Sequence, residues 1–312
     1  VNNYRPISLT SISCKLMEHI IAKHIFHHLE TSGLLYPHQH GFRAGLSTTT
    51  QLVETIHDFA MTIDGKQQID VIAVDFAKAF DKVPHNKLVF KLERAGINLN
   101  IVKWIKAYLT NRNQVVKVDG HVSSPLAVLS GVPQGSVLGP LLFLVYINDI
   151  SAILEPNVRL KLFADDCLIY STVRNKDDQL RINNSLQALS EWCKKWNMEI
   201  NYSKSTYTHI TTKKSVLLFP YVIGDKCLVN VTQFKYLGMT ITQNLNWGTH
   251  IEDVCSKAYQ RLCFLRKKLE HATQDVRLIA YKAFVRPVLE YASVVWSPKQ
   301  NYLNKQLERI QR

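Results

Sequence analysis

Three aspartates follow or interrupt apolar, strand-like sequence, where a charged side chain is costly. Asp75 comes directly after the β-branched run 71–74, and Asp165 and Asp166 separate two apolar segments. A carboxylate at the end of a buried strand must be paired, hydrogen-bonded or bound to a metal. If the fold brings these three together, their repulsion requires a cation, and Mg²⁺ prefers such oxygen ligands. Two such ions side by side would suit phosphoryl transfer.

An Asp-Asp pair is weak evidence by itself, because the chain has a second one. Asp177 and Asp178 follow the polar residues 174–176 and are expected to begin a helix, where negative charge complements the helix dipole. The first pair differs in having apolar neighbours on both sides and a matching acid at Asp75. Spacing alone therefore leaves two interpretations open, a metal site or ordinary structural acids.

In the segments that must position these aspartates, the sequence pattern predicts an irregular mixture of helices and strands. The sequence predicts helices at 13–30, 48–63, 84–95, 101–109, 177–195 and from the glycine-containing loop 130–136 to Asn148. It predicts strands at 71–74, 114–118, 124–129, 160–163, 167–170, 206–210 and 233–237. Asp119-Gly120 and the acidic turn at Asp165 each predict a hairpin. Because no regular βαβ rhythm appears, we expect an α+β fold rather than a Rossmann fold.

The charge of the chain favours a polyanionic partner, most simply nucleic acid or an anionic membrane surface. The 312 residues include 38 Lys+Arg against 25 Asp+Glu, a net charge of +13, and 46% are hydrophobic, enough for a buried core. The longest apolar run, 137–147, is shorter than the ~20 residues of a membrane span, so we expect a soluble protein. Of the two polyanions, we expect nucleic acid rather than a membrane to be the partner. Residues 251–312 hold 12 Lys+Arg against 6 Asp+Glu, which predicts a basic helical module.

Three blocks of this sequence resemble motifs A, B and C of reverse transcriptases. The blocks are VDFAKAFD at 74–81, SGVPQGSVLGP at 130–140 and FADD at 163–166. The amino-acid sequences of these blocks are similar to those of non-LTR (LINE-type, jockey-like) retrotransposon polymerases. Further blocks resemble the fingers motifs and motifs D and E of that family, namely NYRPISL at 3–9, HGFRAGLST at 40–48, NYSKS at 201–205 and YLG at 236–238. The ordered set covers about residues 1–245.

The resemblance implies an α+β right-hand polymerase. Fingers would occupy mainly residues 1–70 and the palm 71–245, followed by a basic, helical, thumb-like region at 246–312. The implied activity is RNA-directed DNA polymerisation, in which dNTPs extend a DNA primer on an RNA template. Two alternatives remain open. One is a degenerate relic that binds nucleic acid without polymerising, and the other is a polymerase of the group II intron maturase or telomerase type.

The resemblance also assigns catalytic roles. Asp75, Asp165 and Asp166 would hold two Mg²⁺ ions, with Mn²⁺ as a substitute, and the backbone of Phe76 would lie near the second ion. Lys204 would donate a proton to the pyrophosphate leaving group.

Further residues would bind the substrates. Phe80 would exclude ribonucleotides by its bulk, with plain core packing as the alternative, and Asp81 would be structural, capping the following helix. The dNTP contacts implied by the resemblance are Arg5, Arg43, Phe76, Phe80, Gln134 and Gly135. The implied nucleic-acid contacts are Lys257, Arg261, Arg266, Lys267 and Lys268, for which a solvated helical face is the alternative.

Location and context are expectations as well. The six cysteines show no zinc-site spacing and fit a reducing compartment. The resemblance implies an intracellular protein, in the nucleus and in a cytoplasmic ribonucleoprotein. It also implies a longer polyprotein with an endonuclease domain outside this chain.

Overall fold

A computed structural model of the chain describes residues 7–311. The helices are α1 (Ile12–Thr31), α2 (Thr48–Asp64), α3 (His85–Arg94), α4 (Leu99–Leu109), α5 (Leu138–Ile147), the 3₁₀ helix η1 (Asn148–Ile153), α6 (Lys176–Trp196), α7 (Gly248–Lys268), α8 (Gln274–Phe284), α9 (Arg286–Glu290), α10 (Ser293–Trp296) and α11 (Asn301–Gln311). The strands are β1 (Gln68–Val74), β2 (Asn113–Gln114), β3 (Lys117–Val118), β4 (His121–Val122), β5 (Leu126–Ala127), β6 (Arg159–Phe163), β7 (Asp166–Val173), β8 (Thr206–Ile210), β9 (Val222–Ile223), β10 (Lys226–Cys227), β11 (Val229–Asn230), β12 (Gln233–Tyr236) and β13 (Met239–Thr242). Every helix and strand predicted from the sequence has a counterpart among these elements.

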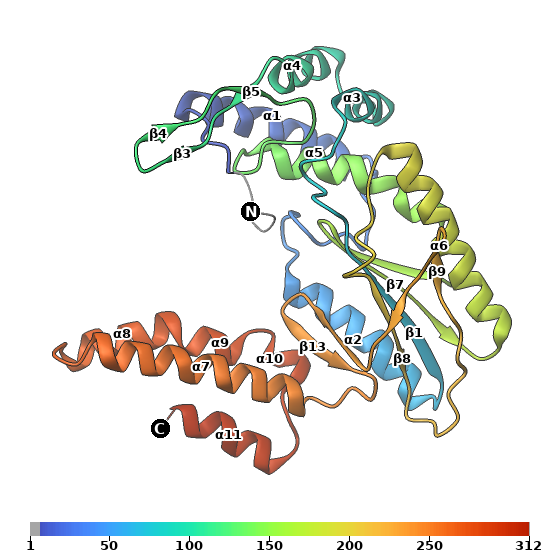
Figure 1. The fold of residues 1–312 in the computed structure, drawn as a ribbon, viewed down its shortest axis with the longest axis vertical. Coiled ribbons are helices and arrows are strands. Elements are labelled where there is room, and N and C mark those ends of the chain that lie inside the picture. Colours follow the sequence, from blue (N-terminus) through green and yellow to red (C-terminus); the bar gives the residue numbers. More distant parts are fainter. Residues whose placement is uncertain (1–6, 312) are drawn as a thin grey trace.

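A five-stranded sheet, in the order β11-β8-β1-β7-β6, forms the centre of the molecule (Figure 1). The central strand β1 pairs antiparallel with β7 on one side and with β8 on the other. Strands β6 and β7 form the hairpin predicted around the acidic turn, with Phe163 opposite Asp166. The predicted hairpin at Asp119-Gly120 also forms, with Val118 opposite His121.

Both faces of the sheet are covered, which explains why β1 is apolar along most of its length. Ile69 and Val71 pack in one cluster with residues of α2, whereas Ile72 and Val74 pack in another with residues of α5 and α6. This alternation follows from the two-residue period of a strand. The sheet is therefore the middle layer of an α+β fold, as predicted.

On the face of the sheet that carries Ile72 and Val74, α5 is the most deeply buried helix. All of its residues except Pro140 are buried. Its N-terminus lies in the interior, where the unpaired N–H groups of the first turn need acceptors. The fully buried carboxylate of Glu18, from α1, accepts hydrogen bonds from Val137 N at 2.7 Å and Leu138 N at 3.0 Å. A negative charge there also complements the helix dipole.

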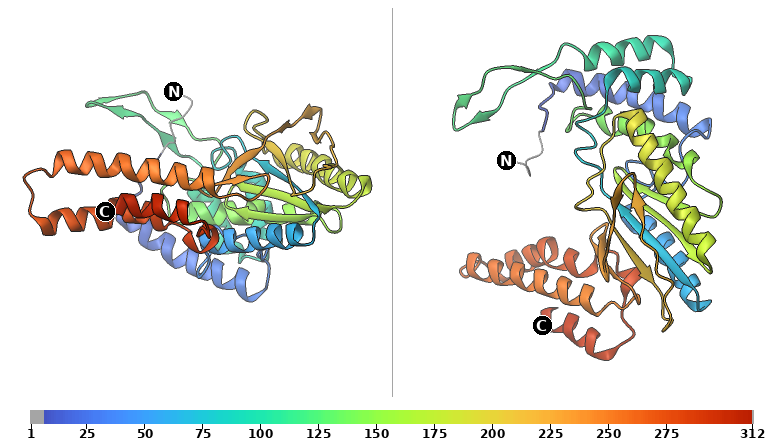
Figure 2. Two further views of the ribbon diagram at one scale, coloured as in Figure 1. Left: turned by 90° about the horizontal axis from the view of Figure 1, so that it is seen from below. Right: turned by 45° about the vertical axis from the view of Figure 1, so that its right-hand side comes forward.

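The C-terminal helices pack on the α2 side of the sheet, opposite the face covered by α5 and α6 (Figure 1). Both views in Figure 2 show α7 and α8 running side by side away from the sheet. Trp296 of α10 anchors the group, because it is buried in the same cluster as α2 residues and donates a hydrogen bond to Tyr291 O. The boundary predicted at residue 245 falls between β13 and α7, and the division into domains stays a prediction. Among the described residues, no helix is both long and apolar enough to span a bilayer.

Candidate active site

The β1–β7 register places the three aspartates at one end of the sheet. Val74 pairs with Cys167, so the antiparallel register carries Asp75 to the position opposite Asp166. Asp165 lies beside it in the turn that joins β6 to β7. Directly opposed residues in an antiparallel pair have Cβ atoms roughly 5 Å apart. The register thus places at the same end of the sheet three residues that are 91 positions apart in the sequence at their widest separation.

The backbone of Asp75 is fixed by the segment before β8. Its N–H donates to Ser205 Oγ at 3.1 Å, and its carbonyl accepts from Asn201 N at 2.7 Å. Ser205 Oγ in turn donates to Asn201 O. Lys204 therefore projects from a turn that is tied directly to Asp75, and its side chain is exposed. Its predicted role as a proton donor stays a prediction.

The main chain of Phe76 faces the acidic turn. Phe76 forms an antiparallel bridge with Ile200, and the flanking bonds are Ala77 N to Glu199 O and Asn201 N to Asp75 O. In such a pair the N–H and C=O of the bridged residue point away from the partner strand. For Phe76 that direction is the β7 side, while its side chain is buried in the core.

A second loop is fastened to the segment that follows Asp75. Gly131 N donates to Val83 O and Val132 N donates to Phe80 O, both at 2.8 Å. Ser130 Oγ donates to Asp81 O at 2.9 Å. A Cβ on Gly131 would lie 2.7 Å from Asp81 O, and Gly131 has a φ of +91°. Only glycine fits this contact without strain.

Asp81 is structural, but its predicted role as a helix cap is wrong. Helix α3 has Pro84 at its N-cap and no side-chain cap. The Asp81 carboxylate instead accepts from Gln134 Nε2 at 2.8 Å. Three residues separate Asp81 from the helix, so its carboxylate does not bind the first turn. It forms the hydrogen bond to Gln134 in the other loop instead. The amide of Gln134, a predicted nucleotide contact, is thereby oriented by an acid from the other loop.

Gly135 is exposed and lies against the start of the chain. Its φ is +94°, and a Cβ there would be 3.0 Å from Ser8 O. Ser8 N also donates to Gln134 O at 2.7 Å. The N-terminal segment therefore reaches the loop predicted to bind the nucleotide. Arg5, a predicted dNTP contact, lies outside the described residues.

Phe80 and Arg43 have clear packing partners. The Phe80 ring is half-buried and stacks on Phe143 of α5, with 4.2 Å between centroids. This contact fixes the ring beside the two loops. Arg43 forms an ion pair with Glu30 at 2.7 Å and donates from Nη1 to Tyr36 O at 3.1 Å. In this structure its guanidinium stabilises the loop that contains Arg43 itself. Its predicted contact with the nucleotide stays a prediction.

Neutral groups surround the carboxylates. Burial raises the pKa of the Cys167 thiol and of the Tyr236 phenol, and the charge of Asp166 contributes to both increases. Both groups therefore stay protonated at neutral pH. Tyr236 OH also accepts from Gln51 Nε2 at 3.2 Å. These two neighbours of Asp166 therefore add no negative charge to this end of the sheet.

The donors suit a hard divalent cation. Three carboxylates and the outward-facing carbonyl of Phe76 are oxygen ligands of the kind that Mg²⁺ prefers. Within residues 7–311, no three His, Cys, Asp or Glu side chains are already grouped as a metal-binding cluster. The fit therefore rests on donor chemistry and on the strand register.

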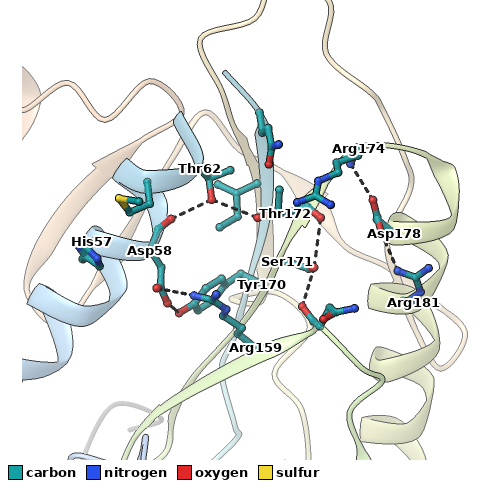
Figure 3. Close-up of a pocket in the computed structure, with 14 residues that line it drawn as sticks. His57, Asp58, Thr62, Arg159, Tyr170, Ser171, Thr172, Arg174, Asp178 and Arg181 are labelled. Carbon is teal, nitrogen blue, oxygen red and sulfur yellow. Dashed lines mark hydrogen bonds and ion pairs between the residues drawn. The ribbon is translucent and has the colours of Figure 1, made fainter. Parts of the chain in front are cut away.

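Two cavities differ in their relation to the predicted site. One of about 480 Å³ is lined by both loops, including Asp81, Gln134 and the basic residues Lys78 and Arg112. The other, about 550 Å³, lies near the start of β1 (Figure 3). Four of its charged side chains form ion pairs, Arg159 with Asp58 and Arg181 with Asp178. Of these two cavities, only the first is lined by a residue predicted to bind the nucleotide, namely Gln134.

The five predicted nucleic-acid contacts are all exposed on α7. Lys257, Arg261 and Lys268 are four and seven residues apart and share one face of the helix. Arg266 and Lys267 lie on other faces. Arg261 also donates to Phe284 O at 3.0 Å, which links this face to α8.

Comparison with known proteins decides the family. A family model described as reverse transcriptase (RNA-dependent DNA polymerase) matches residues 1–241. The chain belongs to the reverse transcriptase family. The matched region contains the three aspartates and both loops described above, so the family assignment made from the motifs is confirmed.

The relatives of this reverse transcriptase are retrotransposon proteins. It is 32% identical over 313 residues to the probable RNA-directed DNA polymerase from transposon BS of Drosophila melanogaster, with 96% of this chain and 34% of that protein covered. It is 28% identical over 319 residues to the RNA-directed DNA polymerase from mobile element jockey of Drosophila funebris, with 98% and 34% covered. The predicted non-LTR, jockey-like character is thus confirmed. The chain spans about a third of the length of these relatives.

Solved structures support the fold. A telomerase from Candida tropicalis, in complex with a fragment of telomeric RNA, matches with a TM-score of 0.53 and 13% identity over 94% of this chain and 49% of that chain. At this identity the similarity shows the polymerase fold alone. The predicted α+β polymerase architecture is confirmed.

The sequence patterns missed three residues that shape this reverse transcriptase site. Gln39 lies one position before the recognised block 40–48, and its side chain contacts the acidic turn. Glu18 lies in a helix that otherwise reads as amphipathic. Ser205 was part of a recognised block but had no assigned role. No spacing rule identifies any of them, because each acts on a segment that is distant in sequence.

The contact at Gly131 predicts a measurable difference between two glycines. We expect Gly131→Ala to lower the free energy of unfolding by about 3 kcal/mol, since it adds a clash with Asp81 to the cost of a positive φ. Gly120→Ala is the matched control, because Gly120 has a φ of +83° with open space around it. It should cost about 1 kcal/mol. Equal losses in urea unfolding would contradict the contact.

Proposed function

We propose that this chain is the polymerase domain of a non-LTR retrotransposon protein and that it extends a DNA primer on an RNA template. The observation that supports the proposal is the pairing of β1 with β7, in which Val74 lies opposite Cys167, directly before Asp75 and directly after Asp166. Ordinary structural acids would not need to converge at one sheet end, since convergence adds repulsion. The family match over residues 1–241 supports the same assignment.

The reaction is a nucleotidyl transfer. The primer 3′-oxygen attacks the α-phosphorus of a dNTP, an O–P bond forms, and the bond to pyrophosphate breaks. Reverse transcriptases use divalent metal, and two Mg²⁺ ions bound by Asp75, Asp165, Asp166 and the Phe76 carbonyl would stabilise the developing charge. Mn²⁺ would substitute for them. Lys204 would donate a proton to the leaving pyrophosphate, because its turn is bonded to Asp75.

The remaining residues orient the substrates. Gln134, held by Asp81, and the backbone of Gly135 would contact the incoming nucleotide beside the cavity of about 480 Å³. The nearby Lys78 and Arg112 add positive charge that suits a triphosphate. Arg5 and Arg43 are further proposed contacts. For Arg43, binding a nucleotide would require its ion pair with Glu30 to open.

Primer extension tests the catalytic proposal. With an RNA template, a DNA primer, dNTPs and Mg²⁺, we expect extension by the wild-type chain and a loss of at least about 1,000-fold in Asp75→Asn and Asp165→Asn, because each removes a charged ligand from the site. Asp177→Asn is the control, since Asp177 is an exposed acid at the start of α6. It should retain wild-type activity. Template binding without extension by the wild type would favour the relic instead.

Phe80 provides a separate test of sugar selection. We propose that its ring, held by the stack on Phe143, blocks a 2′-hydroxyl. Phe80→Val should therefore raise the kcat/KM for ribonucleotides relative to deoxyribonucleotides roughly tenfold, which is the scale of discrimination that side-chain bulk provides. Phe143→Leu is the companion variant, because it loosens the stack without removing the Phe80 ring. Unchanged selectivity in Phe80→Val would leave only the packing role.

Nucleic-acid binding by α7 predicts a salt dependence. We propose that Lys257, Arg261 and Lys268, which share one face, contact the primer–template backbone. Replacing all three with Gln should reduce the slope of log K against log salt by about 2, since each phosphate contact releases counterions. The double variant Arg266→Gln/Lys267→Gln removes charge from other faces and should change the slope less. The same slope change in both variants would contradict a contact limited to one face.

A further inference from the structure

Gln39 has an unusual position for a polar side chain. It lies in the loop between α1 and α2, is only 2% exposed, and reaches the turn that carries Asp165. Its Oε1 accepts from Ala164 N at 2.9 Å, and its Nε2 donates to Ala164 O at 3.2 Å. One amide thus binds both main-chain polar groups of the residue that precedes Asp165. Oε1 also accepts from Gly41 N at 2.9 Å.

Ala164 needs such support because its backbone is strained. It has a φ of +55°, in the left-handed region. For a residue with a Cβ this conformation costs about 1–2 kcal/mol. The direction in which Asp165 and Asp166 leave the turn depends on this one residue. Hydrogen bonds that are available only in the left-handed conformation would offset its cost.

The loop that carries Gln39 is itself fixed to the sheet. Gln39 forms a parallel bridge with Leu162, His40 N donates to Leu162 O, and Leu162 N donates to His38 O, both at 3.0 Å. A Cβ on Gly41 would lie 2.3 Å from Ala164 N, so the two backbones are in contact. The loop therefore extends the edge of the sheet beside β6.

Arg43 holds the other end of the same loop. Its Nη1 donates to Tyr36 O at 3.1 Å and, more weakly, to Gln39 O at 3.4 Å. Its ion pair with Glu30 ties the loop to the end of α1. The backbone of Gln39 is thus fixed by β6 and by Arg43. A residue that is itself held in place can orient another group.

We propose that Gln39 is a positioning residue, which keeps Ala164 in the left-handed conformation and thereby orients Asp165 and Asp166 for Mg²⁺. The inference rests on the proposed polymerase function for its catalytic consequence. Its structural part concerns the turn alone and is tested separately.

The test compares three variants in the full chain. Gln39→Met keeps the volume of the side chain but removes its hydrogen bonds. Ala164→Gly removes the strain that those bonds offset, because glycine accepts a positive φ. Gln179→Met is the matched control. It removes the bonds of another buried glutamine, which bind Asp70 and Leu217 O near the opposite end of β1.

We expect Gln39→Met to lower kcat by about 10- to 100-fold and to raise the Mg²⁺ concentration at half-maximal activity, the scale seen when a supporting partner of a metal ligand is lost. Gln179→Met should leave the Mg²⁺ midpoint unchanged. Adding Ala164→Gly to Gln39→Met should restore part of the loss, because the two effects are coupled through one backbone conformation. Hydrogen exchange at the Ala164 amide should quicken in Gln39→Met only.

Two results would overturn the proposal. One is a Mg²⁺ concentration at half-maximal activity in Gln39→Met that is within twofold of that in Gln179→Met. The other is strict additivity of the effects of Gln39→Met and Ala164→Gly on kcat. If Gln39→Met fails to fold, Gln39→Asn takes its place in the comparison, since it keeps both polar groups but withdraws them from Ala164 by one methylene. If the wild type does not extend primers, the polymerase proposal fails by itself. Calorimetric titration with Mg²⁺ and hydrogen exchange then decide the role of Gln39.

Discussion

The concentration of three carboxylates at one end of a buried sheet is the constraint on which the rest of this structure depends. Carboxylates in a partly buried site repel one another and lose hydration, so they converge only if the backbone holds them there. The antiparallel pairing of β1 with β7 provides that rigidity, because it fixes Val74 opposite Cys167, the residues directly adjoining Asp75 and Asp166. The apolar residues on both faces of β1 stabilise the pairing.

Each neighbouring segment then stabilises a part of this arrangement. The turn at Asn201 and Ser205 binds the backbone of Asp75, and Gln39 binds the backbone before Asp165. These contacts use main-chain atoms or uncharged side chains, and they hold the backbone that carries the aspartates. The two loops near Asp81 and Gln134 are joined by hydrogen bonds of the same kind. The site is therefore built from segments that are far apart in the sequence.

The net charge of +13 is distributed unevenly over this framework. Acidic groups gather at the active end of the sheet, whereas exposed basic residues of α7 lie on helices that project away from it. Trp296 attaches those helices to the sheet through the cluster that includes α2. This division suits a polymerase, in which a cation-binding centre and an anion-binding surface must stay separate, because opposite charges in contact would neutralise both.

The sequence by itself determined the family, the order of helices and strands, and the identity of the three aspartates. Those features are local, since periodicity, caps and short motifs are written in consecutive residues. Only the tertiary structure decided that Asp81 orients Gln134 instead of capping α3, that Arg43 braces its own loop, and that Gln39 supports Ala164. These choices depend on hydrogen bonds between residues 50 to 130 positions apart in most cases. Such partners leave no periodic signal, because a buried polar group is satisfied by whichever segment the fold brings beside it.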